Sequence, residues 1–253
     1  MREEWITSRK NPLLVQIRRL ASSRGARRSA GMFLGDGVKL LEEALKWGAP
    51  LETVVYSEGL DGPELPPEVR TVRVPEDVMA SISPMESPQG ALFLCRMWDT
   101  APPPRLEGGR YLVLDGLQDP GNVGTIWRTA DALEADGLLL VHGCADPFGP
   151  KVVRATMGAC FRLPVWETGP ERLAGLLERS GLALYATALG KDTVDIKTAD
   201  LSRSAVVIGS EGRGVSPELL AMSQRALKIP MRERCESLNA AAAAAVVLWE
   251  MGR

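Results

Sequence analysis

Short apolar runs alternate with amphipathic stretches along most of the chain. In the second half, the β-rich runs Tyr111–Asp115 and Gly137–Val141 flank a stretch with helical spacing, Val123–Leu133. Further strands are expected at Leu163–Trp166, Leu182–Ala188, Ala205–Ile208 and Leu227–Ile229, and further helices at Pro150–Cys160, Glu171–Ser180, Pro217–Arg225 and Asn239–Gly252. Strands that alternate with helices predict an α/β fold, in which helices cover both faces of a mostly parallel sheet.

The first hundred residues predict a smaller α/β unit. Asn11 followed by Pro12 is typical of a helix start, and apolar residues then recur at helical spacing. The polar, basic stretch Ser22–Ala30 predicts a mobile loop. Strands are expected at Gly31–Leu34, Thr53–Ser57, Thr71–Val74 and Ala91–Cys95, and helices at Gly37–Trp47 and Glu76–Ile82.

A proline-rich stretch separates the two units. Thr100–Arg105 contains three consecutive prolines, and two glycines follow at Gly108 and Gly109. Consecutive prolines form an extended, semi-rigid spacer and not a core element. The sequence therefore predicts a small domain over 1–99, a linker over 100–109 and a larger domain over 110–253.

Composition excludes several classes of protein. The 253 residues are 45% hydrophobic and 25% charged, with a net charge of −2, as in globular proteins. No apolar run has the length of a membrane span, and the first residues lack the apolar core of a signal peptide, so we expect a cytoplasmic protein without a membrane partner. Four dispersed cysteines and a single histidine, His142, make a metal site improbable and favour reduced, buried thiols.

Charge is unevenly distributed. Residues 1–30 carry eight basic side chains against two acidic ones, Glu3 and Glu4. Such a cluster suits binding to a nucleic-acid backbone, but a solvated helix face would carry the same charges. Both interpretations remain open on composition alone.

Three loops that follow strands carry the candidate chemistry: Asp115–Asn122, Gly209–Val215 and Met231–Asn239. Parallel strands would bring these loops to one edge of the sheet, where α/β proteins bind ligands. The order of Gly209, Gly212 and Gly214 does not fit the dinucleotide fingerprint, which argues against an NAD-dependent oxidoreductase, and no nucleotide P-loop is present.

The three loops resemble the three motifs of the SpoU branch of the SPOUT methyltransferases. The matching segments are Asp119-Pro-Gly-Asn-Val-Gly-Thr-Ile-Trp-Arg-Thr-Ala130, Ile208-Gly-Ser-Glu-Gly-Arg-Gly-Val215 and, within Ile229–Asn239, Glu236-Ser-Leu-Asn239. The N-terminal part is similar to the ribosomal-protein-like substrate domain of many SpoU enzymes through Asn11-Pro12, Gly31–Leu45 and Gln89-Gly90, with Asp36 where that domain usually has Glu.

The resemblance implies S-adenosylmethionine as methyl donor, a ribose 2′-hydroxyl of RNA as acceptor, a homodimer, and a deep trefoil knot formed by the chain after Ala205. Ribosomal RNA is the favoured substrate, and transfer RNA is the alternative. A non-catalytic RNA-binding or ribosome-assembly protein on the same fold is a second hypothesis. The intact set of motif residues argues against it.

The resemblance also assigns candidate site residues. The catalytic candidates are Asn122, Arg128, Glu211, Ser237 and Asn239, and the cofactor candidates are Thr187, Gly209, Ile229 and Leu238. Arg128 stands where the family comparison places the group that acts on the hydroxyl, either as a base or as a grip on the neighbouring phosphate.

Structural alternatives remain open for the other catalytic candidates. Asn122 could simply cap a helix, Glu211 could pair with Arg213, and Ser237 and Asn239 could only start the last helix.

Overall fold

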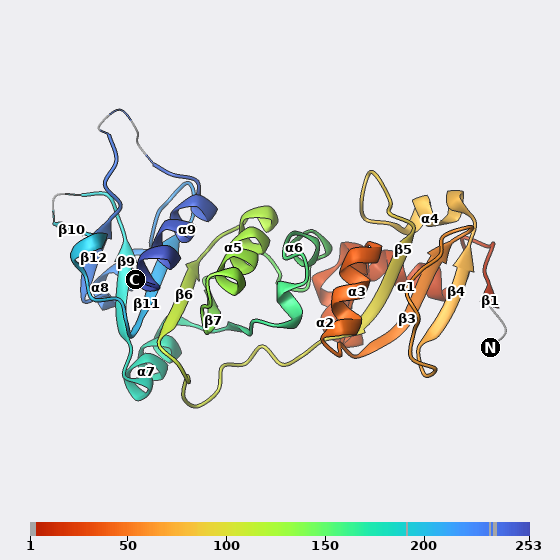
Figure 1. Cartoon of the computed structure of the whole chain (residues 1–253), viewed down its shortest axis with the longest axis horizontal. Helices are drawn as coiled ribbons and strands as arrows, with labels where there is room; N and C mark the ends of the chain where they lie inside the picture. Colours follow the sequence, from red (N-terminus) through yellow and green to blue (C-terminus); the bar gives the residue numbers. More distant parts are fainter. Residues whose placement is uncertain (1–3, 191, 233, 235–236) are drawn as a thin grey trace. The chain divides into compact units, whose positions relative to one another are not determined.

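The computed structural model describes residues 4–190, 192–232, 234 and 237–253, so Cys235 and Glu236 lie outside the described residues. The chain divides into two compact units (Figure 1). The first comprises Met1–Trp98 with Asp146–Phe161, and the second comprises Asp99–Ala145 with Arg162–Arg253. The division at Trp98 lies beside the expected linker, but the segment Asp146–Phe161 packs in the first unit, although its sequence position had placed it in the second.

The first unit contains a five-stranded mixed sheet of order β1-β4-β3-β5-β2. Its strands are β1 (Glu4–Trp5), β2 (Met32–Asp36), β3 (Leu51–Ser57), β4 (Arg70–Val74) and β5 (Ala91–Arg96). Its helices are α1 (Pro12–Ser22), α2 (Arg24–Ala30), α3 (Val38–Lys46), α4 (Glu76–Ile82) and α6 (Pro150–Ala155), with a 3₁₀ turn at Ala159–Phe161.

Helix α1 begins as its sequence predicts. The Asn11 side chain accepts a hydrogen bond from the Leu13 amide, and Pro12 occupies the first turn. Leu13, Ile17 and Leu20 are buried and pack with α4 and one face of the sheet in a single core cluster. Alternation along β2 places Leu34 in this cluster and directs Phe33 to the opposite face, toward Trp98 and other aromatic rings.

The prediction of a mobile loop over Ser22–Ala30 is wrong, because this stretch forms helix α2. Ser23 caps the helix by accepting a hydrogen bond from the Ala26 amide. Arg27 is buried, and its guanidinium donates to the Asp146 carboxylate at 2.6 and 2.9 Å and to the Leu20 carbonyl at 2.5 Å. Part of the basic N-terminal cluster therefore stabilises the fold and is not available to a ligand.

The second unit contains a seven-stranded sheet of order β10-β12-β9-β11-β6-β7-β8 in which every pairing is parallel, as expected. Its strands are β6 (Arg110–Asp115), β7 (Gly137–Val141), β8 (Val165–Glu167), β9 (Ala183–Thr187), β10 (Thr193–Asp195), β11 (Ser204–Gly209) and β12 (Arg225–Lys228). Its α-helices are α5 (Pro120–Ala132), α7 (Pro170–Ser180), α8 (Pro217–Met222) and α9 (Ala240–Met251), with a 3₁₀ turn at Ile196–Thr198.

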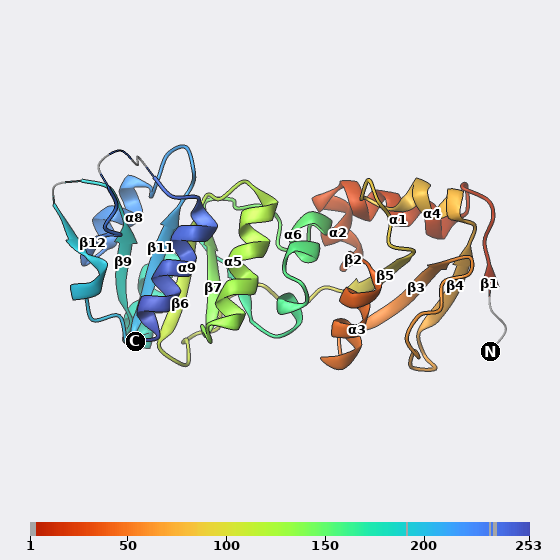
Figure 2. The same ribbon diagram turned by 45° about the horizontal axis from the view of Figure 1, so that its top comes forward.

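Alternating side chains of the buried strands face two helical layers. Helices α5 and α9 lie side by side, and α9 contacts β11 while α5 contacts β7 (Figures 1 and 2). Val113 and Val207 belong to the core cluster that includes residues of α7 and α8. The sheet thus has helices on both faces, which confirms the predicted α/β class.

Helix α6 is shorter than predicted for Pro150–Cys160. It ends at Ala155, and the next residues include Met157 with a φ of +50° and Gly158 with a φ of +93°. Left-handed backbone cannot continue a right-handed helix, which explains the early end. Within the described residues, no helix is long and apolar enough to cross a membrane.

Candidate active site

The three predicted motif loops meet at the carboxyl edge of the parallel sheet. Strand β6 ends at Asp115 and β11 ends at Gly209, and these two residues are opposite each other in the register of the pair. Strand β12 ends at Lys228, and the chain then leads to α9. Neighbouring parallel strands end at the same edge, so their loops form one site.

Asn122 does not cap helix α5. The helix begins at Pro120, and the Asp119 carboxylate is the cap, accepting from the Asn122 amide at 2.7 Å. The Asn122 side chain instead donates to the Glu211 carboxylate, and its oxygen accepts from the Asn239 side-chain amide at 3.1 Å. One residue from each motif thus joins a single hydrogen-bonded group.

The start of α9 also differs from expectation. Asn239 is the N-cap, and its side-chain oxygen accepts from the amides of Ala241 and Ala242 at 2.9 and 3.3 Å. Ser237 precedes the cap and lines the cavity described below. Asn239 therefore both starts the helix and contacts Asn122, whereas the alternative in which Ser237 starts the helix is wrong.

The second motif forms a tight loop. The backbone groups of Ser210 and Gly214 exchange hydrogen bonds of 3.1 and 2.8 Å, and Gly214 has a φ of +68°. A Cβ placed on Gly209 would lie 2.1 Å from the Gly214 carbonyl carbon, so no side chain fits there. Glu211 near the tip bonds to Asn122, and no ion pair between Glu211 and Arg213 is present among the described residues.

A cavity of about 400 Å³ lies beside this loop. All four cofactor candidates line it, together with Glu211 and Ser237. Further lining residues are mostly apolar or glycine, among them Leu189, Ile208, Leu220, Leu227 and Met231. The volume and the mixture of apolar walls with a few polar groups are those of a small-molecule site.

The polar side chain of one cofactor candidate is already occupied. The Thr187 hydroxyl donates to the Val207 carbonyl at 2.8 Å, so its proton is not available to a ligand. Leu189 and Leu220 also line the cavity, but the sequence did not predict a role for them. Both are exposed apolar residues: Leu189 follows strand β9, and Leu220 lies in α8, the helix after the loop. No group of three His, Cys, Asp or Glu side chains in the described parts of the chain could hold a metal ion.

Arg128 lies apart from the cavity. It is exposed on α5, on the helix face that also carries Gly121 and Thr125, and it is not among the lining residues. Within the ranges that the structure describes, its side chain forms no hydrogen bond or ion pair. The structure of one chain thus assembles the other catalytic candidates around the cavity but leaves Arg128 facing outward.

These features define an α/β protein with a cavity suited to a small molecule at the carboxyl ends of its strands. Residues 109–249 match the SpoU rRNA methylase family, and residues 11–92 match the MRM3-like substrate binding domain. The chain belongs to the SpoU rRNA methylase family, whose members use S-adenosylmethionine.

Individual relatives are similar over nearly their whole length. An uncharacterized tRNA/rRNA methyltransferase of Synechocystis is 37% identical, covering 98% of this chain and 93% of the relative. The Bacillus subtilis 23S rRNA (guanosine(2553)-2′-O)-methyltransferase RlmP is 32% identical, covering 97% of this chain and 98% of that protein. The crystal structure of an AdoMet-bound rRNA methyltransferase from Sinorhizobium meliloti has a TM-score of 0.85 at 31% identity and covers 98% of this chain and 97% of its own.

Proposed function

We propose that this protein transfers a methyl group from S-adenosylmethionine to the 2′-hydroxyl of a ribose in ribosomal RNA. The observation that carries the proposal is the cavity at which the three SpoU motif loops meet, with the Asn122–Glu211–Asn239 group beside it. The Bacillus relative named for 2′-O-methylation of 23S rRNA and the AdoMet-bound Sinorhizobium structure support it.

The residues of the cavity fit this cofactor. Leu189, Ile229 and Leu238 offer apolar surface for an adenine ring, and Gly209 lets main chain approach a ligand closely. When bound, S-adenosylmethionine supplies an electrophilic methyl group on a sulfonium. Glu211 and Ser237, two of the polar side chains of the lining, would orient the polar parts of the cofactor and the ribose.

Arg128 is the proposed group that holds the acceptor. Its guanidinium suits bidentate hydrogen bonds to the phosphate beside the target ribose, and its positive charge would favour loss of the hydroxyl proton. A guanidinium is a very poor proton acceptor, which makes the gripping role chemically better founded than that of a general base. Asn122, Glu211 and Asn239 would keep the three loops in register for an aligned transfer.

We further propose a homodimer in which Arg128 serves the cavity of the partner subunit. Arg128 is exposed and does not line the cavity of its own chain. The outer face of α9 is apolar, with Ala242, Val246 and Trp249 at helical spacing, and the Trp249 side chain is 63% exposed. A second copy of the chain would bury this face.

A deep trefoil knot, formed after Ala205, belongs to the same proposal. Strand β11 is inserted between β9 and β6, with its following loop at the cofactor cavity, an arrangement compatible with the knot that the family resemblance implies. We place the protein in the cytoplasm, where a bacterial relative of this kind would meet ribosomal RNA. The first unit would contact the RNA through phosphates and shape.

Replacing Arg128 tests the enzyme hypothesis. We expect Arg128→Ala to lower the rate of methyl transfer to ribosomal RNA by about 10²–10³-fold, as for loss of a charge-stabilising group, with unchanged cofactor affinity. Arg128→Lys should recover little activity because it lacks the bidentate fork. Arg225→Ala, which removes another exposed arginine of the second unit, is the matched control.

Two outcomes would redirect the proposal. Full methylation by Arg128→Ala would remove Arg128 from the mechanism. A wild-type protein that binds ribosomal RNA but transfers no methyl group to it would favour the non-catalytic hypothesis, and transfer to transfer RNA alone would favour the alternative substrate.

A further inference from the structure

A second cavity, of about 600 Å³, lies against the same loop as the cofactor cavity. Both cavities are lined by Ser210, Arg213, Gly214 and Val215. The loop from Ser210 to Ser216, called here the wall loop, is thus their common wall. The other lining residues of the second cavity include Asp115, Gln118, His142 and Glu218.

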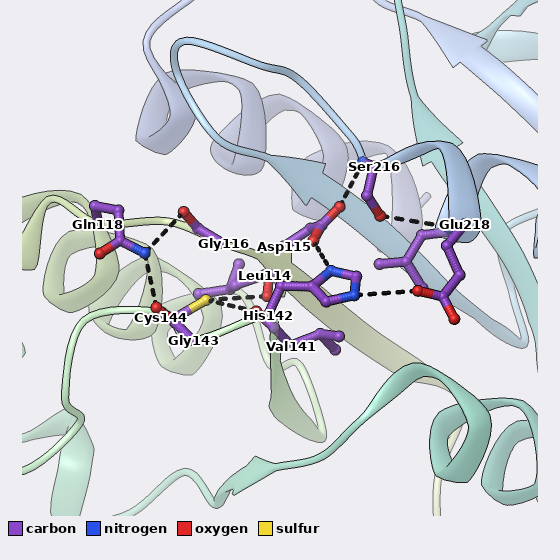
Figure 3. Close-up of polar contacts among 11 residues, drawn as sticks. Leu114, Asp115, Gly116, Gln118, Val141, His142, Gly143, Cys144, Ser216 and Glu218 are labelled. Atoms are coloured by element: carbon purple, nitrogen blue, oxygen red, sulfur yellow. Dashed lines mark hydrogen bonds and ion pairs between the residues drawn. The ribbon is translucent and has the colours of Figure 1, made fainter.

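Asp115 connects the two ends of the wall loop. The loop starts after Gly209, which pairs with Asp115 across the sheet, and it ends at Ser216, whose backbone amide donates to Asp115 Oδ2 at 2.6 Å. The other carboxylate oxygen, Oδ1, lies 2.6 Å from His142 Nδ1 (Figure 3). Asp115 is only 4% exposed, so these contacts satisfy a carboxylate that burial would otherwise penalise.

His142 extends the connection to helix α8. Its Nε2 lies 3.3 Å from the Glu218 carboxylate, and Glu218 stands in the first turn of α8, which Ser216 caps (Figure 3). The His142 backbone has a φ of +53°, a conformation that is uncommon for residues other than glycine. The adjoining turn is fixed by Gln118, whose side-chain amide donates to the Gly143 carbonyl at 2.7 Å.

The contacts of Asp115 and His142 can affect the cofactor cavity because the wall loop is short and its backbone is hydrogen-bonded to itself. Gly214 bonds back to Ser210, and Gly209 allows the end of the loop to pack directly on its start. A displacement of Ser216 would therefore move Val215 and Gly214 in the cofactor cavity, and with them Glu211, which bonds to Asn122.

We propose that Asp115 and His142 are positioning residues for the proposed methyl transfer: they hold the wall loop in the conformation that binds the cofactor, without lining the cofactor cavity themselves. The inference rests on the proposed function. Ser216, through its backbone amide, is the point at which they act on the loop.

A pair of variants at Ser216 isolates the amide. Ser216 has φ −60° and ψ 148°, which proline can adopt, so Ser216→Pro removes the N–H bonded to Asp115. Both Ser216→Pro and Ser216→Ala lose the capping hydroxyl, and only the proline variant loses the amide. We expect S-adenosylmethionine to bind the proline variant about tenfold or more weakly than the alanine variant, as for loss of a hydrogen bond to a charged group, with equal affinity for RNA.

His142→Asn is a second test. Asparagine tolerates the positive φ of this position, but its shorter side chain cannot reach Glu218. The hydrogen bond to Asp115 raises the pKa of His142 above its ordinary value, and the charged groups around it are Asp115, Glu218 and Arg213. A raised pKa means that the contribution of the imidazolium is present at low pH and is lost as pH rises through that pKa. Over this range wild-type cofactor affinity should weaken relative to that of His142→Asn, so the ratio of the two affinities should change as pH rises.

Equal cofactor affinity of the two Ser216 variants would overturn the proposal, even if the proline variant melts at a lower temperature. If Ser216→Pro does not fold, the His142→Asn profile decides: a ratio to wild type that does not change with pH contradicts the proposal. These failures differ from a failure of the proposed function, in which wild-type protein would bind no S-adenosylmethionine at all.

Discussion

The two cavities on either side of the wall loop are built from opposite kinds of chemistry. The cofactor cavity is lined mainly by glycine and by apolar side chains such as Ile229 and Leu238. The lining of the other cavity includes Asp115, His142 and Glu218, and the His142 ring contacts both carboxylates. A single peptide segment thus presents main chain to a ligand on one side and is anchored by charged side chains on the other.

The two sides of the wall loop therefore have different proposed roles: one side binds the cofactor, and the other side holds the loop in place. Main-chain groups can bind a cofactor only if the backbone that carries them is fixed. The hydrogen bonds of Asp115 supply that constraint from the far side. Each of the following changes alters a residue of the cofactor cavity and predicts a different loss.

The largest loss is expected from Gly209→Ala. A Cβ at this position would lie 2.1 Å from a backbone carbon of Gly214, and backbone cannot move aside as a flexible side chain could. We expect cofactor affinity to fall by more than about 100-fold, the equivalent of losing roughly 3 kcal/mol by overpacking. Calorimetric titration measures it.

Gly212→Ala is the control, because no atom lies within 4 Å of its added Cβ, and this variant should bind the cofactor within about threefold of wild type. If the two alanine variants bound equally well, close packing of the loop on Gly209 would not be needed for the site.

A smaller effect is expected from Thr187→Val. The hydroxyl bonds to the Val207 carbonyl at 2.8 Å, so its loss should lower the free energy of unfolding by about 1 kcal/mol and change cofactor affinity by less than about threefold. Denaturant melts and cofactor titration measure the two quantities. Thr193→Val, which removes a hydroxyl bonded to the nearby Gly190 carbonyl, is the control, and a tenfold loss of affinity in Thr187→Val alone would place the hydroxyl on the ligand.

Most elements of the larger unit could be predicted because central strands such as β6, β7 and β11 are buried and helices such as α7 have one apolar face. Runs such as Gly137–Val141 are apolar throughout, as parallel strands with helices on both faces require. Helix α2 was missed for the opposite reason. Its basic residues give no apolar face, and Arg27 becomes buried only because Asp146, 119 residues away, provides its partner.

The errors at the helix starts have a local cause. Asp119 followed by Pro120 is the same cap and first-turn pair that correctly located α1 at Asn11-Pro12, so the start of α5 could have been found from the sequence. In α9, Ser237 and Asn239 are both good caps, and composition alone does not choose between them.

The site could be predicted in part. The motif resemblance selected residues that converge on one cavity, although they come from loops up to 117 positions apart. It did not select Asp115 and His142, because their contacts to Ser216 and Glu218 join positions 101 and 76 residues apart and leave no short pattern in the sequence. Arg128 does not line the cavity of its own chain, so its proposed role rests on the proposed homodimer.

The most direct test of the account is a calorimetric titration of the protein with S-adenosylmethionine, repeated on Leu238→Arg. Leu238 is 40% exposed and lines the cofactor cavity, and Val15→Arg, at a 41% exposed position of the first unit, is the matched control. We predict saturable binding by the wild type and by Val15→Arg, and no binding by Leu238→Arg, because an arginine there would fill and charge an apolar cavity. Unchanged binding by Leu238→Arg would contradict the placement of the cofactor, and absent binding by the wild type would contradict the proposed function itself.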